Sequence, residues 1–224
     1  YSHKGFSVLA TYRELKYMST KLSYTGNGIG NILNYLPALT RQYTYMLANL
    51  NPYQSNGEGE RGGQVDIYYS LRNKKDRSQY WNFHANASIF YSDKAVTKKS
   101  RLLWRDINGD VERQWNKQFK TTLLVSVQEW SPTHGMDDVT YASNIVVLDG
   151  LYKFDRKKSL RAEVQYLYSQ DYEKDWVAGL VEFSLAPRWS FSVSDMYNLG
   201  TTKVHYYSGS VSYTQKNTRL QLSY

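Results

Sequence analysis

One predicted strand carries residues that suit nucleophilic catalysis. Asn82, His84, Asn86 and Ser88 alternate with apolar residues, so they share one face. Ser, His and Asn can together activate a nucleophile if the His lies within hydrogen-bond reach of the Ser. His84 and Ser88 are four residues apart, about 13 Å along a strand, so a partner Ser would have to come from a neighbouring strand. The pattern favours a hydrated polar wall and leaves a hydrolase as a minor alternative.

A second strand carries an acidic stripe, formed by Asp106, Asn108, Asp110 and Glu112. Two interpretations stay open. The stripe could select cations or polar solutes in a bore, or it could pair with basic residues across the bore and stabilise a closed barrel. The expected polar residues of this inner face are Asp66, Asn82, His84, Asn86, Asp106, Asn108, Asp110, Glu112, Arg161, Glu163 and Arg219.

Metal-ligand spacing is not present in these patterns. The chain has no Cys, and none of its four His residues pair at a ligand spacing. The Asp-x-Asn-x-Asp run from Asp106 resembles a calcium loop, but the required Gly and distal Glu are misplaced. Asp137 and Asp138 are a weaker calcium candidate and are better explained as solvated. The sequence therefore predicts no metal, no cofactor and no catalytic residues.

Period-two alternation is the commonest pattern in the chain. In 159–170, Leu160, Ala162, Val164, Tyr166 and Tyr168 oppose polar residues, and Leu167 is the one exception. Many such segments are longer than the usual soluble strand of about 5–6 residues and match the roughly 9–11 residues of a tilted membrane strand. The eleven expected strands are 5–17, 62–73, 80–92, 101–115, 119–130, 138–154, 159–170, 175–185, 189–197, 203–214 and 218–224.

Composition and connections agree with a membrane barrel. The chain has 22 Tyr and 6 Trp, which suit a surface with one wet and one apolar end. Short basic turns alternate with longer loops, as in outer-membrane barrels. The net charge of +8 lies largely in those turns and forms no stripe with stacking aromatics, so nucleic acid is not an expected partner. The residues expected in two aromatic girdles are Trp81, Tyr91, Tyr166, Tyr168, Trp176, Trp189 and Tyr206.

The connection 25–61 differs from the others. Pro37 opens a helix-like stretch, and Asn51-Pro52 ends it. We expect a short helix that folds into the bore as a plug, docks on a partner outside the barrel, or caps the barrel mouth. Its expected contact face is formed by Leu36, Leu39, Tyr43, Leu47 and Leu50.

The same connection carries a family resemblance. Residues 34–42 read NYLPALTRQ, and together with 45–49, 51–53, 56–58, 103–108 and 119–122 they resemble a family of Bacteroidota outer-membrane proteins known only as a domain of unknown function. The resemblance spans most of the chain, and LPALTRQ is its most specific element. It implies a barrel in the bacterial outer membrane. Because family members are longer at both ends, it also implies that Tyr1 and Tyr224 are not true termini. It carries no catalytic residues.

The expected fold is a single all-β domain over 1–224, an antiparallel up-and-down transmembrane barrel of about twelve or more strands. The favoured function is an accessory or structural subunit of a larger outer-membrane complex for secretion, protein insertion or nutrient uptake. The main alternative is a porin-like diffusion channel or transporter for small polar solutes. Expected partners are outer-membrane lipid, lipopolysaccharide and other outer-membrane or periplasmic proteins.

Overall fold

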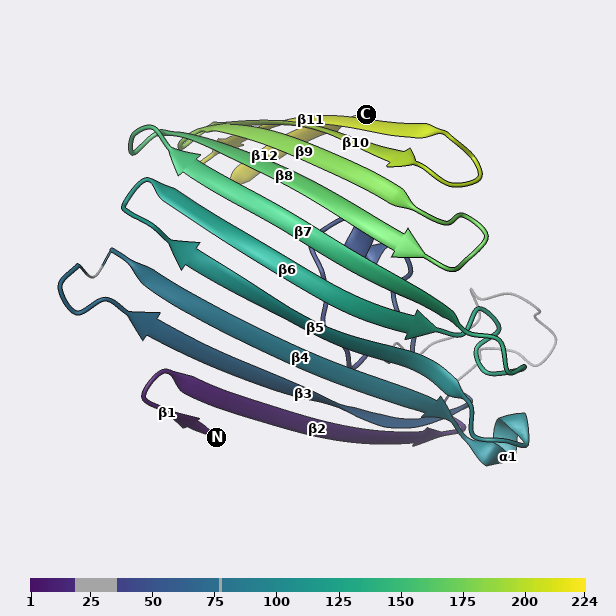
Figure 1. Ribbon diagram of the computed structural model, residues 1–224. Helices are drawn as coiled ribbons and strands as arrows, with labels where there is room; N and C mark the ends of the chain where they lie inside the picture. The colour runs from purple at the N-terminus through teal and green to yellow at the C-terminus, as the bar shows by residue number, and fades with distance from the viewer. Residues whose placement is uncertain (19–35, 77) are drawn as a thin grey trace.

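The chain folds into one strongly curved antiparallel sheet (Figure 1). The computed structural model describes residues 1–18, 36–76 and 78–224. Twelve strands follow one another in the sheet in the order of the sequence. They are β1 (Ser2–His3), β2 (Phe6–Lys16), β3 (Gly59–Arg72), β4 (Tyr80–Ser92), β5 (Leu102–Gln114), β6 (Phe119–Trp130), β7 (Tyr141–Lys153), β8 (Lys158–Ser169), β9 (Trp176–Leu185), β10 (Trp189–Asn198), β11 (His205–Gln215) and β12 (Thr218–Ser223).

These strands confirm the all-β, antiparallel, up-and-down prediction. Each of the eleven expected segments coincides with one of β2–β12, and only the two-residue β1 was missed. The sheet is not closed into a barrel, because β1 and β12 are its two edges. Among the described residues, no helix has the length and apolar character needed to cross a membrane.

Side-chain chemistry separates the two faces of the sheet. Partners directly across a strand pair point to the same side, so the registers assign every strand residue to a face. The convex face carries exposed apolar side chains such as Ile107, Leu148, Val164 and Val193. The concave face carries buried polar ones such as Asp106, Ser126 and Gln165. Alternation along the strands therefore places mostly apolar residues outside, and inside it places polar residues together with a buried apolar cluster.

Short turns at one end of the sheet are built by local side-chain caps. Asn73 Oδ1 accepts the backbone N–H of Lys75, Asn116 Oδ1 accepts that of Gln118, and Asp155 Oδ1 accepts that of Lys157. Asn and Asp favour tight turns because they can bond the backbone two residues on. The Asp155 contacts with the Lys157 and Lys158 backbone lower the pKa of its carboxyl.

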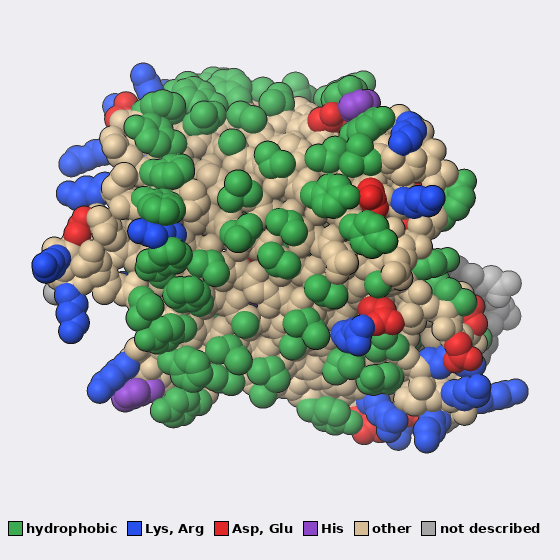
Figure 2. All heavy atoms as spheres, viewed as in Figure 1, with side chains coloured by type: hydrophobic (Ala, Val, Ile, Leu, Met, Phe, Trp, Pro, Cys, Tyr) green, Lys and Arg blue, Asp and Glu red, His purple; other side chains and the backbone are tan. Residues whose placement is uncertain are grey.

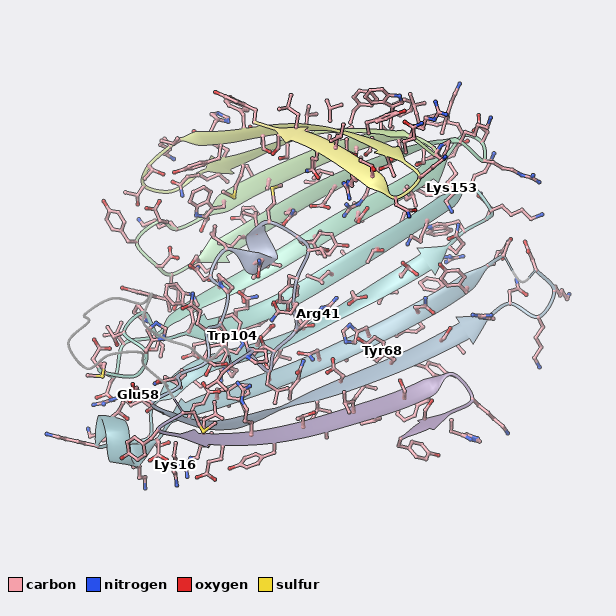
Figure 3. All side chains as sticks on the ribbon, turned by 180° about the vertical axis from the view of Figure 1, so that it is seen from behind. Lys16, Arg41, Glu58, Tyr68, Trp104 and Lys153 are labelled. Carbon is pink, nitrogen blue, oxygen red and sulfur yellow. The ribbon has the colours of Figure 1, made fainter. Side chains whose placement is uncertain are left out.

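Residues 36–58, here called the inner segment, cross the concave face. The segment lies behind the sheet in Figure 1 and in front of it in Figure 3. The predicted helix over 36–50 is wrong: the segment is irregular except for one 3-10 turn, η2 (Leu47–Asn49). The other helix of the described chain, α1 (Lys94–Thr97), is a single turn in the β4–β5 connection. Residues 25–35 of the predicted loop lie outside the described residues.

Candidate functional site: the filled concave face

Alternate residues of the inner segment reach successive strands. Arg41 contacts β5, Tyr43 contacts β5 and β6, Tyr45 contacts β7, and Leu47 contacts β8. Two residues of helix rise only about 3 Å, which is less than the roughly 4.8 Å between neighbouring strands. An extended backbone spans that spacing, and this explains why the segment is not helical.

Arg41 and Tyr43 bind the acidic stripe of β5. The Arg41 guanidinium donates to Asn108 Oδ1 at 2.7 Å and forms an ion pair of 2.5 Å with Asp110 Oδ1. The Tyr43 hydroxyl donates to Asp106 Oδ2 at 2.6 Å. Burial beside the Asp106 carboxylate raises the pKa of Tyr43, so the phenol remains a proton donor. The inner segment therefore binds three residues of the stripe, Asp106, Asn108 and Asp110.

A second polar network holds the segment on β7 and β8. The Tyr45 hydroxyl donates to Asp149 Oδ2 at 3.3 Å, and Arg161 pairs with the same carboxylate oxygen at 2.8 Å and with Glu163 at 2.6 Å. The Leu47 backbone N–H donates to Gln165 Oε1 at 2.8 Å. Truncating one partner of such a buried network leaves the others unsatisfied, so its cost exceeds that of a surface bond.

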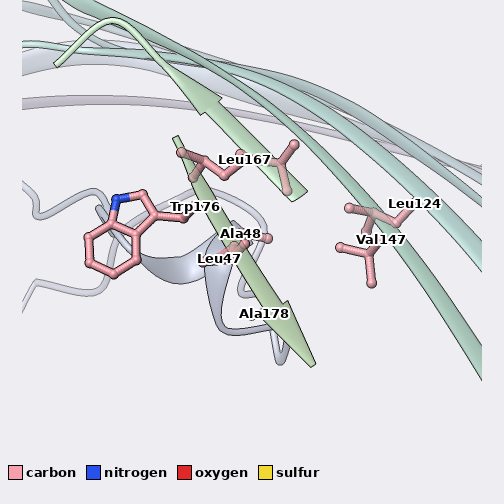
Figure 4. Close-up of a cluster of buried hydrophobic side chains, with 8 residues drawn as sticks. Leu47, Ala48, Leu124, Val147, Leu167, Trp176 and Ala178 are labelled. Atoms are coloured by element: carbon pink, nitrogen blue, oxygen red, sulfur yellow. The ribbon is translucent and has the colours of Figure 1, made fainter. Parts of the chain in front are cut away.

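An apolar cluster anchors the middle of the segment (Figure 4). Leu47 is fully buried, and the partly buried Leu50 packs beside it. The strands supply the rest of the cluster, which explains why Leu167 is apolar although the other concave-face residues of β8 are polar. The buried members are Leu47, Ala48, Leu124, Ile145, Val147, Leu167, Trp176 and Ala178.

The start and end of the segment meet at a buried carboxylate. Glu60 is fully buried and pairs with Arg13 at 2.7 Å. Its other oxygen accepts the Tyr53 hydroxyl at 2.5 Å and the Asn56 backbone N–H at 2.6 Å. Arg13 also donates to the Pro37 carbonyl at 2.5 Å. These bonds close the segment into a loop fixed on β2 and β3.

A polar pocket of about 770 Å³ lies beside Arg41 of the inner segment. Figure 3 shows Arg41 on the inner segment and Tyr68 on the sheet beyond it. The Tyr68 ring stacks on His84 with centroids 4.0 Å apart. Asp66, Asp110 and Glu112 also line the pocket, so both charge signs face it.

His84 has no serine partner in this pocket. Its Nδ1 lies 3.1 Å from Asp110, and its Nε2 lies 3.1 Å from Asp66. The Ser88 hydroxyl is buried without a hydrogen-bond partner in the described chain. Both ring nitrogens of His84 are therefore engaged by carboxylates, and a Ser–His nucleophile is not assembled. Over the described residues, no three His, Asp or Glu side chains are grouped to hold a metal ion.

The predicted polar residues share the concave face. Ten of them line it beside the inner segment or the pocket, and Arg219 lies on the same side of the exposed edge strand β12. Of the predicted plug residues, Leu39, Leu47 and Leu50 pack on the sheet clusters and Tyr43 bonds β5. Leu36 is half-buried.

The predicted girdle needs two corrections. Trp81, Tyr91, Tyr166, Tyr168 and Trp189 lie on the convex face. Trp176 instead belongs to the buried concave cluster. Tyr206 lies on the same side, with its ring centroid 5.8 Å from that of Trp176. Both were misassigned because position near a strand end does not decide which face a residue occupies.

Sequence reasoning missed the residues that hold the inner segment. Arg13, Tyr45, Asp149 and Gln165 were not among the predicted site residues. One signal was present: in RQYTYML, residues 41–47, every second residue hydrogen-bonds the sheet, namely Arg41, Tyr43, Tyr45 and Leu47. The helical spacing of the leucines obscured this period of two.

Comparison with known families assigns the chain to a family. The model of a family described as Family of unknown function (DUF6029) matches residues 1–224. The chain belongs to this family. Comparison with curated proteins found no match, and none was found among solved structures. Membership confirms the expected relation to a domain of unknown function.

Proposed function

We propose that this chain forms the wall of a bacterial outer-membrane β-barrel whose bore is filled by its own inner segment. It serves as a structural or accessory subunit of a larger outer-membrane complex rather than as an open pore. The observation that carries this proposal is the inner segment itself, which contacts strands from β2 to β9.

The convex face supports a lipid contact. Apolar side chains on it are widely exposed; Leu148 is 56% exposed and Val164 60%. Larger hydrophobic side chains gather near the ends of the strands, with Lys and Arg beyond them at the short turns on the left of Figure 2. Apolar strands between aromatic bands, with a polar inside, are the surface of an outer-membrane barrel.

Closure follows from the same environment. Lipid offers no hydrogen-bond partner to an open strand edge, and each unpaired backbone group there costs several kcal/mol. The free edges of the sheet, at β1 with the uncovered part of β2 and at β12, therefore pair in the membrane, with each other or with further strands of the assembled protein.

Planar-bilayer conductance tests the filled bore. The native protein is expected to give no steady conductance. A variant with 36–58 replaced by a Gly-Ser linker of equal length is expected to conduct, because the barrier has been removed. The matched control replaces 131–137 in the same way and should stay closed. Steady conductance of the native protein would contradict a blocked bore.

Purification in gentle detergent tests the subunit role. A stoichiometric partner, identified by mass spectrometry, is the expected result. A lone barrel would contradict it.

The polar pocket favours a second candidate, a channel or transporter for small polar solutes. Its mixed charges and the exposed Tyr68 ring suit a polar ligand. For this candidate, solute uptake into liposomes would require the native protein and would change in Arg41→Ala. The accessory role predicts no solute uptake by the native protein or by the Arg41→Ala variant.

A further inference from the structure

A basic pocket of about 470 Å³ lies among the short turns of β5–β6, β7–β8 and β9–β10. Five cationic side chains line it, with one carboxylate among them. Those cations are Lys117, Lys153, Arg156, Lys157 and Lys158. None of the five forms an ion pair with a described residue, in contrast to Arg41, Arg101 and Arg161 elsewhere in the chain. An anionic ligand would complement this concentration of positive charge.

Asp155, the one acidic residue that lines the pocket, already accepts two backbone hydrogen bonds. Asp155 Oδ1 accepts the backbone N–H groups of Lys157 at 2.6 Å and Lys158 at 2.9 Å. It shapes the turn and contributes one negative charge against the five positive charges of the lining. The pocket therefore keeps a large positive excess.

An aromatic cluster lies next to the pocket on the convex face. The rings of Phe119 and Tyr152 are 6.4 Å apart, and those of Tyr152 and Phe154 are 5.0 Å apart in an edge-to-face arrangement. All three are exposed, and Phe154 also lines the basic pocket. Aromatic rings of this kind lie at the headgroup level of a membrane.

We propose that this pocket binds the phosphate of an anionic lipid headgroup, with the glycerol and upper acyl chain against Phe119, Tyr152 and Phe154. Clusters of Lys and Arg beside a membrane-spanning element attract anionic lipid. The adjoining aromatic cluster favours a lipid over an acidic protein, because a peptide carboxylate would need no apolar neighbour. This inference rests on the proposed membrane location of the chain.

The test measures lipid binding by the full-length protein in detergent micelles with native mass spectrometry. The probes are tetraoleoyl cardiolipin, dioleoyl phosphatidylglycerol and dioleoyl phosphatidylcholine. The native protein should bind the two anionic lipids more tightly than phosphatidylcholine, and inorganic phosphate should not compete at equal concentration. High salt should weaken the preference, because exposed charges are screened.

The decisive variant is Arg156→Gln/Lys157→Gln/Lys158→Gln. Cardiolipin affinity should fall about tenfold or more, because each basic residue at an anionic surface contributes roughly a fivefold factor. Lys74→Gln/Lys75→Gln, on the β3–β4 turn outside the pocket, is the matched control and should change affinity less than about twofold. Equal losses in both variants would overturn a local site.

Two further measurements distinguish a failure of the proposed membrane location from a failure of the lipid site alone. Flotation with phosphatidylcholine vesicles, by native protein and variants alike, shows that all are folded and membrane-bound. Native protein that does not float overturns the proposed function and this inference together. Native protein that floats but binds all three lipids equally overturns the lipid site alone. If poly-L-glutamate displaces cardiolipin at equal charge, the site recognises an acidic chain and the lipid assignment is wrong.

Discussion

The Tyr43 hydroxyl lies 2.6 Å from Asp106 Oδ2 and joins the inner segment to the middle of strand β5. Asp106 has no exposed surface, and its other oxygen accepts the Ser126 hydroxyl at 2.9 Å. A carboxylate this buried is tolerated only when it is fully hydrogen-bonded. The inner segment is therefore part of what makes the polar concave face stable.

Tyr43→Phe removes this bond and leaves a buried carboxylate oxygen without its donor. We expect the free energy of unfolding to fall by about 1–3 kcal/mol, measured by urea unfolding of the refolded protein in detergent. Tyr166→Phe is the matched control, because it removes an exposed 3.0 Å bond to Asp175 and should cost within about 0.5 kcal/mol. Equal effects of the two substitutions would show that the segment does not depend on this contact.

Gly62→Ala is expected to separate β3 from β4. A Cβ at Gly62 would lie 2.1 Å from the Ile89 carbonyl oxygen and 2.6 Å from the Phe90 ring. Phe90 is fully buried under Tyr53, so neither neighbour can move away. We expect a loss of about 1–3 kcal/mol or more in the same unfolding assay. Gly150→Ala, whose Cβ would meet its nearest atoms at 4.0 Å, should be tolerated, and a comparable loss there would refute the steric explanation.

Alkaline pH should loosen the inner segment. Burial, reinforced by a neighbouring carboxylate, raises the pKa of Tyr43, Tyr45 and Tyr53 above the ordinary value of 10.0. A raised folded-state pKa gives stability that is complete below the unfolded value and is lost as pH rises towards the folded one. The melting temperature of the native protein should therefore fall between pH 9 and pH 11.

The control for this pH effect replaces all three tyrosines by phenylalanine. The variant starts from a lower melting temperature, but the decline above pH 10 should be shallower, because these phenols no longer titrate. Parallel declines in the two proteins would show that other groups cause the alkaline loss.

The strands were predictable because one rule governs each of them. Alternation placed Val65, Ile67 and Tyr69 on one face and Asp66 on the other, and the structure agrees. Leu167 broke the rule in β8 because it packs in the concave-face cluster that also holds Leu47, 120 positions earlier in the chain and part of the inner segment. A long-range contact of this kind leaves no local signature.

The inner segment was harder to predict because two periods overlap in it. Leu36, Leu39, Tyr43, Leu47 and Leu50 fit a helix, whereas Arg41, Tyr43, Tyr45 and Leu47 fit an extended chain. Only the position of acceptors on β5, β7 and β8 decides between them. Strand register also determines which face Trp176 and Tyr206 occupy, and this register cannot be read from the sequence alone.

The central claim is that the convex face contacts lipid and the concave face does not. The chain has no native Cys, so nitroxide labels can be placed singly along β8 in liposomes. Labels at Leu160, Ala162, Val164, Tyr166 and Tyr168 should be accessible to oxygen and protected from a water-soluble nickel chelate. Labels at Arg161, Glu163, Gln165 and Leu167 should be protected from oxygen by the inner segment, which gives an alternation of period two. Equal access of the nickel chelate to the first set would place the convex face in water and contradict the account.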